Sequence, residues 1–457
     1  MGIKQTLSKA ALSTAMDYIS GDPEKNLPRL LGFLENLGWD KNQAAVFREV
    51  LSDPENVWYR YLMNLWRDVD NDVLKTTFCN FGLNASFFGY KEQERNAEKY
   101  GCNIPWAILL DPTSACNLHC TGCWAAEYGD KLNLTYEEMD SIIRQANDLG
   151  CYFFLYTGGE PLVRKKDIIR LCEAQPDCQF TAFTNATLID ETFADEMLRV
   201  KNFIPAISVE GFEEATDFRR GAGTFRKVEK AMALLKAKRL PFGLSCCYTS
   251  RNTEVIGSEA YFDQMIEWGA KFCWLFTYMP VGRDAAPELM VTAEQRRFMY
   301  EQVRAFRKTK PIFTMDFWND GECAGGCIAG GRRYLHINAN GDMDPCAFIH
   351  YYSDSNIREK SLLEGLRSPL FMAYHDNQPF SDNLLRPCPL LDNQGALARM
   401  VQQTGAHSTD LQNPEDVQAL TDKCIPAADR WQPVADSLWA CSGHCAGCVS
   451  SSNCAGK

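Results

Sequence analysis

The chain has 457 residues and a formal net charge of −12, and 46% of its residues are hydrophobic and 23% charged. A chain of this length holds one large domain with smaller additions. The acidic balance excludes a nucleic-acid binder that works by neutralising phosphates. No apolar run reaches the ~18 residues that cross a bilayer, so no membrane span is predicted.

Cysteine is the unusual feature of the composition, with 20 residues. The first twenty residues lack the apolar core of a signal peptide. Metal or redox chemistry in a reducing cytoplasm is therefore favoured over a disulfide framework. Most of the cysteines fall into three groups at the spacing of metal ligands, at positions 116/120/123, 323/327/346 and 441/445/448/454.

Residues 1–100 are predicted to form a helical N-terminal domain. The segment from Asp22 to Gly38 begins at an Asp-Pro pair, ends at a glycine and carries leucines at helical spacing. Residues 54–74 follow and are rich in Trp and Tyr. These aromatic residues are expected to pack the helices together.

Residues 101–310 alternate short apolar runs with amphipathic stretches. Strands are predicted in six segments: 106–111, 152–159, 180–185, 204–211, 242–250 and 272–280. Six such units predict an α/β fold with a parallel sheet, either open or curled into an incomplete barrel. In such folds the chemistry lies at the carboxyl ends of the strands.

Residues 311–457 are loop-rich and cysteine-rich. The segment 336–342 predicts a short hairpin that turns at Asn340 and Gly341, and helix is predicted at 392–404 and 414–423. His336 and His350 are interpreted as ordinary polar residues that flank the hairpin. Asp342 and Asp344 are candidate bases, and turn chemistry explains them equally well.

The octapeptide CNLHCTGC places Cys116, Cys120 and Cys123 directly after the first predicted strand. Three thiolates can hold three irons of a [4Fe-4S] cube. The fourth iron is then open, which is typical of a metal that does chemistry. Asn117 and Gly122 disfavour the alternative of a helix that buries the three cysteines on one face. Zinc, with His119 as a fourth ligand, is the other alternative.

This segment closely resembles the signature of the radical S-adenosylmethionine (radical SAM) superfamily, and further motifs follow in the family's order. Trp124 stands where the family has an aromatic residue. The later motifs are Gly158-Gly159-Glu160-Pro161, TNAT at 184–187, ISVEG at 207–211, Arg219-Arg220-Gly221 and YMPVGR at 278–283. The resemblance implies a partial (β/α)6 barrel over residues 101–310.

The resemblance also implies roles for individual residues. The first three cysteines bind a [4Fe-4S] cluster, and S-adenosylmethionine (SAM) chelates its open iron. One-electron reduction then splits SAM into methionine and a 5′-deoxyadenosyl radical, which abstracts hydrogen from a substrate. Arg219 or Arg220 is placed to pair with the SAM carboxylate, and Trp124 to lie near the adenine. The other expected SAM contacts are Thr157, Gly158, Gly159, Glu160, Pro161, Asn185, Ser208 and Glu210.

The later cysteines resemble the SPASM domain, a C-terminal extension of some radical SAM enzymes that carries auxiliary clusters. Thirteen residues separate Cys327 from Gly341, and four separate Gly341 from Cys346. Cys323 and Cys388 are the candidates that complete a first auxiliary [4Fe-4S] cluster. Residues 311–457 would then form a SPASM-like domain.

The tail has a second copy of the cysteine spacing, in the octapeptide CSGHCAGC at 441–448. No strand precedes this copy and no GGEP motif follows it, so it does not predict a second SAM site. The tail continues the SPASM spacing in part, but the next cysteine would be due at position 458. A second auxiliary cluster would use Cys441, Cys445, Cys448 and Cys454; the alternative is a cysteine-rich tail without a cluster.

The predicted reaction is hydrogen abstraction from a peptide or protein side chain, leading to oxidation or crosslinking. The alternatives are radical modification or adenosylation of a small molecule or lipid, and a non-catalytic iron–sulfur or zinc protein. Such an enzyme would take electrons from a reducing partner such as flavodoxin or ferredoxin.

Overall fold

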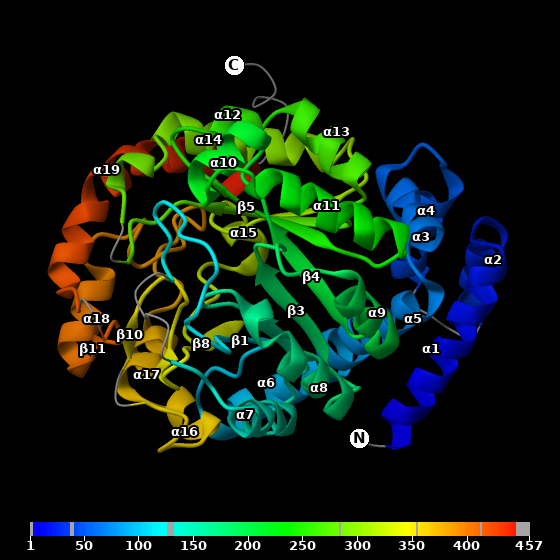
Figure 1. Cartoon of the computed structure of the whole chain (residues 1–457), viewed down its shortest axis with the longest axis horizontal. Coiled ribbons are helices and arrows are strands. Elements are labelled where there is room, and N and C mark those ends of the chain that lie inside the picture. Colours follow the sequence, from blue (N-terminus) through cyan, green and yellow to red (C-terminus); the bar gives the residue numbers. More distant parts are fainter. Residues whose placement is uncertain are drawn as a thin grey trace.

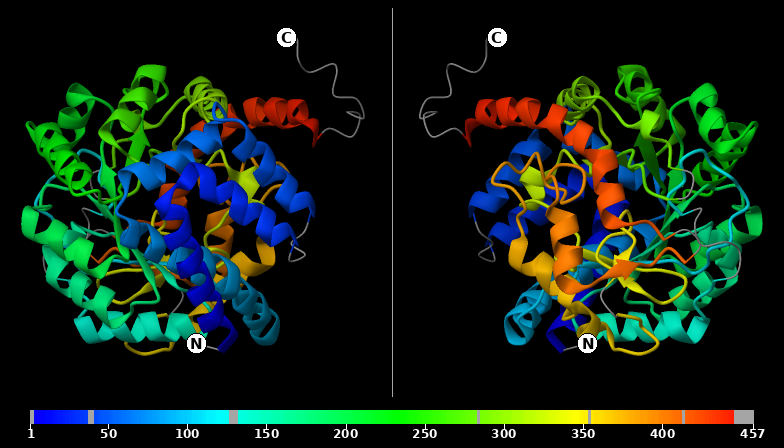
Figure 2. Two further views of the ribbon diagram at one scale, coloured as in Figure 1. Left: turned by 90° about the vertical axis from the view of Figure 1, so that its right-hand side faces the viewer. Right: turned by 90° about the vertical axis from the view of Figure 1, so that its left-hand side faces the viewer.

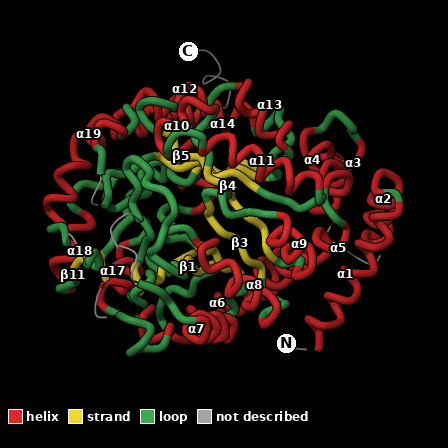
Figure 3. Tube along the Cα trace, in the orientation of Figure 1, coloured by secondary structure: helices red, strands yellow, loops and turns green. Residues whose placement is uncertain are grey.

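The computed structural model describes residues 3–36, 41–125, 132–282, 285–352, 355–411 and 414–444. The fold is α/β, with a mostly parallel sheet at its centre. In Figure 1 the N-terminal helices, in blue, lie to one side of the sheet, and the C-terminal segments, in yellow to red, lie to the other. Figure 3 shows the strands enclosed by helices and by long loops.

The described part of the first hundred residues is mainly helical, as predicted. The elements are α1 (Ile3–Gly21), α2 (Pro23–Asn36), α3 (Lys41–Ser52), α4 (Val57–Asp68), α5 (Asn71–Thr77), the π-helical η1 (Phe78–Gly89) and α6 (Tyr90–Tyr100). Asn80 donates hydrogen bonds to the carbonyls of Pro176 and Cys178, just before the third strand. Lys271, just before the sixth strand, pairs with Asp68 of α4 at 2.7 Å. These helices therefore cover the amino ends of the strands.

The six predicted strands are confirmed, and they pair in chain order in parallel. They are β1 (Ala107–Leu110), β2 (Phe153–Tyr156), β3 (Gln179–Thr184), β4 (Phe203–Ser208), β5 (Gly243–Tyr248) and β6 (Phe272–Thr277). Three further strands, which the sequence did not predict as part of this sheet, extend it. On one side β7 (Phe313–Asp316) pairs with β6, and on the other β8 (Tyr334–Ile337) pairs in parallel with β1.

The helices between the strands pack on one face of the sheet. They are α7 (Tyr136–Asp148), η3 (Pro161–Arg164), α8 (Lys165–Ala174), α9 (Glu191–Val200), α10 (Glu213–Arg220), α11 (Thr224–Ala237), α12 (Thr253–Ile256), α13 (Glu259–Trp268), η4 (Pro287–Leu289) and α14 (Ala293–Phe306). Strand residues alternate between the two faces. Phe154 and Tyr156 pack in the core under these helices, whereas Phe153 and Leu155 belong to a second core on the opposite, inner face.

The C-terminal segments close the inner face. They comprise α15 (Gly321–Ala324), β9 (Met343–Asp344), β10 (Tyr351–Tyr352), α16 (Leu362–Leu366), α17 (Pro369–Asn377), α18 (Ala396–Thr404), β11 (His407–Ser408), α19 (Val417–Trp439) and η5 (Ala440–His444). The predicted hairpin is confirmed, because β8 and β9 pair antiparallel. Figure 2 shows α19, in red, running across the upper edge of the molecule. Within the described ranges, no helix has an apolar stretch long enough to cross a bilayer.

Candidate active site

The three cysteines of the first octapeptide lie in the loop that follows β1, and all three are partly buried. Burial, with a smaller effect from the neighbouring Glu160, Cys123 and Cys120, raises the pKa of Cys116 to about 11. Thiols that perturb one another in this way lie close together. Because iron binds thiolates, loading a metal here would release protons.

Residues that follow much later in the chain hold the backbone of this loop in place. Thr121 donates its amide hydrogen to the carbonyl of Arg219 at 2.8 Å, at the end of α10. Gly122 has a φ of +66°, and a Cβ there would lie 2.5 Å from the hydroxyl of Tyr278. Glycine is therefore required at position 122 both by its backbone conformation and by the tyrosine that packs on it.

The GGEP loop after β2 runs directly beside the segment that leads into Cys116. Gly159 donates to the carbonyl of Thr113 at 3.1 Å, and Glu160 donates to that of Ala115 at 2.8 Å. A Cβ on Gly159 would lie 2.3 Å from the oxygen of Ala115. Gly159 thus permits a close approach of these two loops of the protein.

The Glu160 side chain points inward and joins two strand ends. It is fully buried and accepts hydrogen bonds from the Thr184 hydroxyl at 2.6 Å and from the Asn185 amide at 2.8 Å. Burial raises the pKa of Glu160, although these hydrogen bonds offset part of that effect. The side chain of Glu160 therefore positions the GGEP loop against the end of β3.

The other predicted contacts gather at the same edge of the sheet. Asn185 donates to Asn117 of the cysteine loop at 2.8 Å, and Asn117 donates to Thr187 at the same distance. Thr157 donates its amide hydrogen to Leu110 at the end of β1, and Ser208 ends β4 with a buried side chain. Four neighbouring strands thus contribute to one site, as the parallel sheet predicts.

Glu210, Arg219 and Arg220 form a buried charge cluster beside this loop. Glu210 accepts from Arg219 Nη1 at 2.8 Å and from Arg220 Nε at 3.0 Å. Burial alone would raise the pKa of Glu210, but the two guanidinium groups hold it below its usual range. Two cations with one anion leave a net positive charge, and its electrostatic influence reaches Cys120 and Cys123. Such a charge favours thiolates and a carboxylate ligand.

Trp124 turns toward the C-terminal segments. Its ring makes edge contacts with His336, Phe348 and His350, at centroid distances of 5.8, 6.0 and 5.6 Å. Phe348 is two residues from Cys346. The aromatic residue that follows the third cysteine therefore connects the first cysteine loop to the second group of cysteines.

His336 is not the ordinary polar residue that its sequence position indicated. It is fully buried between two carboxylates, with Nε2 3.0 Å from Asp111 and Nδ1 3.3 Å from Asp344. Burial opposes protonation, but these carboxylates raise the pKa of His336 to about 10. These shifts favour the protonated imidazole, and burial also raises the pKa of its partner Asp344 to about 7, so the triad holds more protons than its free groups would at neutral pH. No local pattern marks this triad, because its members are 225 and 8 positions apart from His336.

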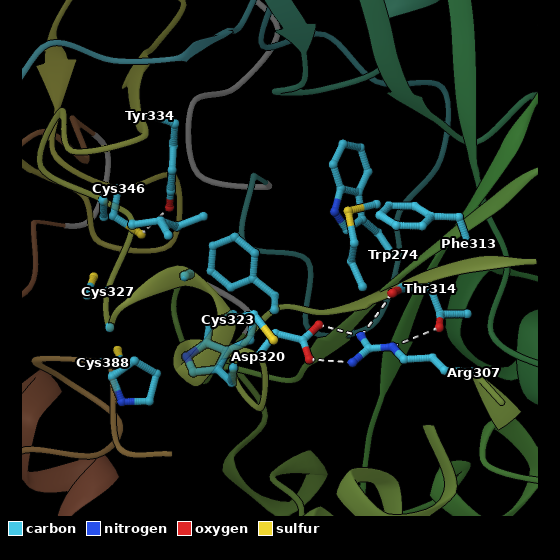
Figure 4. A pocket seen from close by; sticks show the side chains of 18 of the residues that line it. Trp274, Arg307, Phe313, Thr314, Asp320, Cys323, Cys327, Tyr334, Cys346 and Cys388 are labelled. Atoms are coloured by element: carbon cyan, nitrogen blue, oxygen red, sulfur yellow. Dashed lines mark hydrogen bonds and ion pairs between the residues drawn. The ribbon is translucent and has the colours of Figure 1, made fainter. Parts of the chain in front are cut away.

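The four cysteines predicted for an auxiliary cluster come together. Cys323 of α15, Cys327, Cys346 and Cys388 all line one cavity of about 460 Å³. Cys327, Cys346 and Cys388 lie on one side of it, opposite Trp274 and Phe313 (Figure 4). Burial raises the pKa of Cys327 to about 12, and Cys346 adds to the effect. The hydroxyl of Tyr334 lies 2.9 Å from the sulfur of Cys346.

Across the part of the chain that the structure describes, no group of three or more His, Cys, Asp or Glu side chains is arranged to hold a metal ion. Of the tail cysteines, Cys441 is exposed in η5, and Cys445, Cys448 and Cys454 lie outside the described residues.

Residues 110–250, which carry the first cysteine loop and the GGEP loop, match the family model described as the radical SAM superfamily. The chain contains a radical SAM domain. Because the chain is a radical SAM enzyme, the alternative of a non-catalytic iron–sulfur or zinc protein is rejected. A [4Fe-4S] cluster and SAM are typical of radical SAM enzymes. The match does not identify the substrate of this enzyme.

Two curated relatives show how far the likeness extends. The AdoMet-dependent heme synthase of Methanosarcina barkeri is 23% identical over 291 residues, which are 57% of this chain and 82% of the relative. The cysteine-type anaerobic sulfatase-maturating enzyme of Clostridium perfringens is 32% identical over 167 residues. That alignment takes in 32% of this chain and 45% of the relative, so less than half of that enzyme is matched.

A solved structure supports the same fold. The crystal structure of Streptococcus suis SuiB bound to S-adenosylmethionine superposes with a TM-score of 0.54 and 20% sequence identity. The superposition covers 65% of this radical SAM enzyme and 75% of SuiB. At this identity the likeness concerns the fold.

Proposed function

We propose that this enzyme reductively cleaves SAM at a [4Fe-4S] cluster held by Cys116, Cys120 and Cys123, and that the 5′-deoxyadenosyl radical abstracts hydrogen from a substrate. One observation carries the proposal. The GGEP loop is hydrogen-bonded along the residues that lead into Cys116, through Thr113 and Ala115. The predicted cluster loop and the predicted SAM loop thus form one unit at the carboxyl ends of the strands.

The residues around that unit are proposed to bind and orient SAM beside the cluster. When bound, the cluster supplies the electron transfer that splits the sulfonium, and the protein supplies position and charge. Backbone carbonyls of Thr157 to Pro161 receive the SAM amino group. The surplus positive charge of Arg219 and Arg220 over Glu210 favours the SAM carboxylate. Asn185 and Ser208 meet the ribose or methionine end, and Trp124 borders the adenine.

The auxiliary cluster is proposed to bind to Cys323, Cys327, Cys346 and Cys388, in a SPASM-like domain spanning residues 311–457. The shared cavity supports this ligand set. A second auxiliary cluster on Cys441, Cys445, Cys448 and Cys454 rests on their sequence spacing. Reduction of these centres would come from a flavodoxin or ferredoxin in the cytoplasm.

A peptide or protein side chain is the first candidate substrate. Two relatives support it: one is named a sulfatase-maturating enzyme, and a second SuiB structure is described as bound to the precursor peptide SuiA. A small molecule or lipid is the second candidate. It is favoured by the apolar side chains, such as Trp274, Phe313 and Ile328, that line the large cavity next to the auxiliary cysteines.

Anaerobic reconstitution followed by dithionite and SAM tests the reaction. The wild-type chain is expected to release 5′-deoxyadenosine and methionine. Cys120→Ala should lose this product, whereas Cys79→Ala, a change in the N-terminal helices, should keep it. A wild-type protein that holds its full iron content and still yields no 5′-deoxyadenosine would contradict the proposal.

A further inference from the structure

A second cavity, of about 410 Å³, lies at the amino ends of the strands, under the N-terminal helices. It adjoins the cavity of the auxiliary cysteines, because Tyr61, Trp274, Phe313 and Met315 line both. Its wall is made by aromatic and aliphatic side chains of α4, η1, β4 and β6, such as Leu65, Phe78, Ile204 and Phe272. These two adjoining cavities, most of whose lining is apolar, are together called the apolar space.

One part of this space reaches the surface beside α4 and β7. Trp58 and Phe313 line it there, their rings 6.4 Å apart, and 43% and 42% of their surfaces are exposed. Large apolar side chains at an opening favour entry of an apolar molecule. The space continues inward from these rings to Cys327, Cys346 and Cys388.

The charged residues along this space are already neutralised. Lys271 pairs with Asp68 at 2.7 Å, and Arg307 donates to Asp320 at 2.8 Å. Lys310 is held by Glu259 and Asp263, at 2.8 and 2.6 Å. An anionic ligand would have to compete with these acids for each cation, and burying its charge without a partner is costly.

A peptide is also a poor match for the deeper cavity. Each peptide unit carries one N–H and one C=O, and burying them without hydrogen bonds costs free energy. The wall of the deeper cavity offers few polar side chains, chiefly Gln179, Thr181 and Thr77. Gln179 already donates to the carbonyls of Phe180 and Asn202, and its Oε1, which has no partner within the described residues, could accept a hydrogen bond from only one peptide N–H of such a chain. A hydrocarbon chain has no such groups to satisfy.

We infer that this space binds an extended, uncharged hydrocarbon chain, the apolar part of a lipid-like substrate, which enters past Trp58 and Phe313 and lies along the barrel interior. The inference rests on the proposed radical function and names its substrate class. It selects the small-molecule or lipid candidate over the peptide.

Gly82 allows a direct test. It lines the deeper cavity, and a Cβ there would have no atom within 4 Å. Gly82→Phe should therefore fill the cavity without displacing the protein, and Gly82→Ala is the matched control that leaves most of it open. Thr181→Leu, on β3, is a second cavity-filling variant to use if Gly82→Phe does not fold.

The experiment uses the reconstituted full chain and the neutral fluorophore N-phenyl-1-naphthylamine. The wild type and Gly82→Ala should bind the probe with enhanced, blue-shifted emission, and 1-hexadecanol should displace it. Gly82→Phe should bind the probe about tenfold or more weakly, since overpacking a site of this kind costs at least the equivalent free energy. Palmitate should compete less well than 1-hexadecanol, and a polar hexapeptide should not compete.

Three results would overturn the inference: no probe binding by the wild type, unchanged binding in a folded Gly82→Phe variant, or better competition by palmitate or the hexapeptide than by the alcohol. The release of 5′-deoxyadenosine without substrate, measured on the same samples, reports separately on the proposed function. Gly82→Phe should retain it, so a failed binding test and a failed radical reaction are distinguishable.

Discussion

Arg219 Nη1 lies 2.8 Å from Glu210 Oε1, and only 11% of the arginine side chain and none of the glutamate side chain is exposed. This ion pair joins the end of β4 to the end of α10, and the carbonyl of the same arginine holds the loop of the first three cysteines. The ion pair therefore helps to hold the loop of the first three cysteines in position.

Removing the Glu210 carboxylate should destabilise the fold. Glu210→Ala leaves two buried guanidinium groups without an anion, and breaking a buried pair costs about 3–5 kcal/mol. Glu213→Ala is the matched control, because Glu213 pairs with Arg226 at an exposed site and such pairs are worth roughly 0–1 kcal/mol. Anaerobic urea unfolding measures both. Equal losses of unfolding free energy in the two variants would show that the buried Glu210 pair stabilises the fold no more than an exposed pair.

Gly159→Ala should weaken SAM binding. The new Cβ would lie 2.3 Å from the oxygen of Ala115, so the two loops must separate. Overpacking of this kind costs ~1–3 kcal/mol, which corresponds to a roughly 5- to 150-fold change in affinity. Isothermal titration of the reconstituted protein with SAM measures it. Gly32→Ala, in α2, meets no atom within 4 Å and should bind like the wild type; wild-type affinity in Gly159→Ala would refute the role of the loop contact.

Cys388→Ala should lower the iron content by about four atoms per chain, because a [4Fe-4S] cube needs its protein ligands. Cys424→Ala is the matched control. Cys424 is buried in α19 and belongs to the same apolar core as Cys388, but it does not line the cavity of the four cysteines. Iron analysis and Mössbauer spectra compare the two variants. Loss of iron from Cys424→Ala, with Cys388→Ala unchanged, would reassign the fourth ligand.

The buried imidazolium of His336 should make stability depend on pH. Asp111 and Asp344 overcome the effect of burial and raise the pKa of His336 to about 10, from its ordinary value of 6.5. A group with a raised pKa contributes its full stabilisation below pH 6.5 and loses it as the pH rises toward 10.

His336→Gln, made in an Asp344→Asn background, isolates this contribution, because the Asp344 carboxyl, whose pKa is raised to about 7, would otherwise titrate in the same range. The difference in unfolding free energy with and without His336 should be largest near pH 6 and should shrink as the pH approaches 10. A series of urea unfolding curves measures it. The difference is the relevant quantity, because several thiols also titrate near the upper end of this range. A pH-independent difference would mean that His336 is neutral.

Much of the barrel was predictable because its signals are local. The six apolar runs, the glycines of the GGEP loop and the spacing of Cys116, Cys120 and Cys123 each depend on residues close together in the chain. The pairing of β7 and β8 with the barrel strands was not predicted, because strands of four residues carry little pattern and the path of the chain selects their partners. The pairing of β8 with β1 joins residues more than 200 positions apart.

The sequence by itself determined the family of chemistry, because three thiols in one short loop and the motifs that follow need only local spacing to be recognised. The tertiary structure alone decided which distant groups meet. It brought Cys388 to the cavity of Cys346, enclosed His336 between Asp111 and Asp344, and buried Arg219 and Arg220 on Glu210. Those contacts depend on burial and on charge pairing across the folded chain, and no local pattern records either.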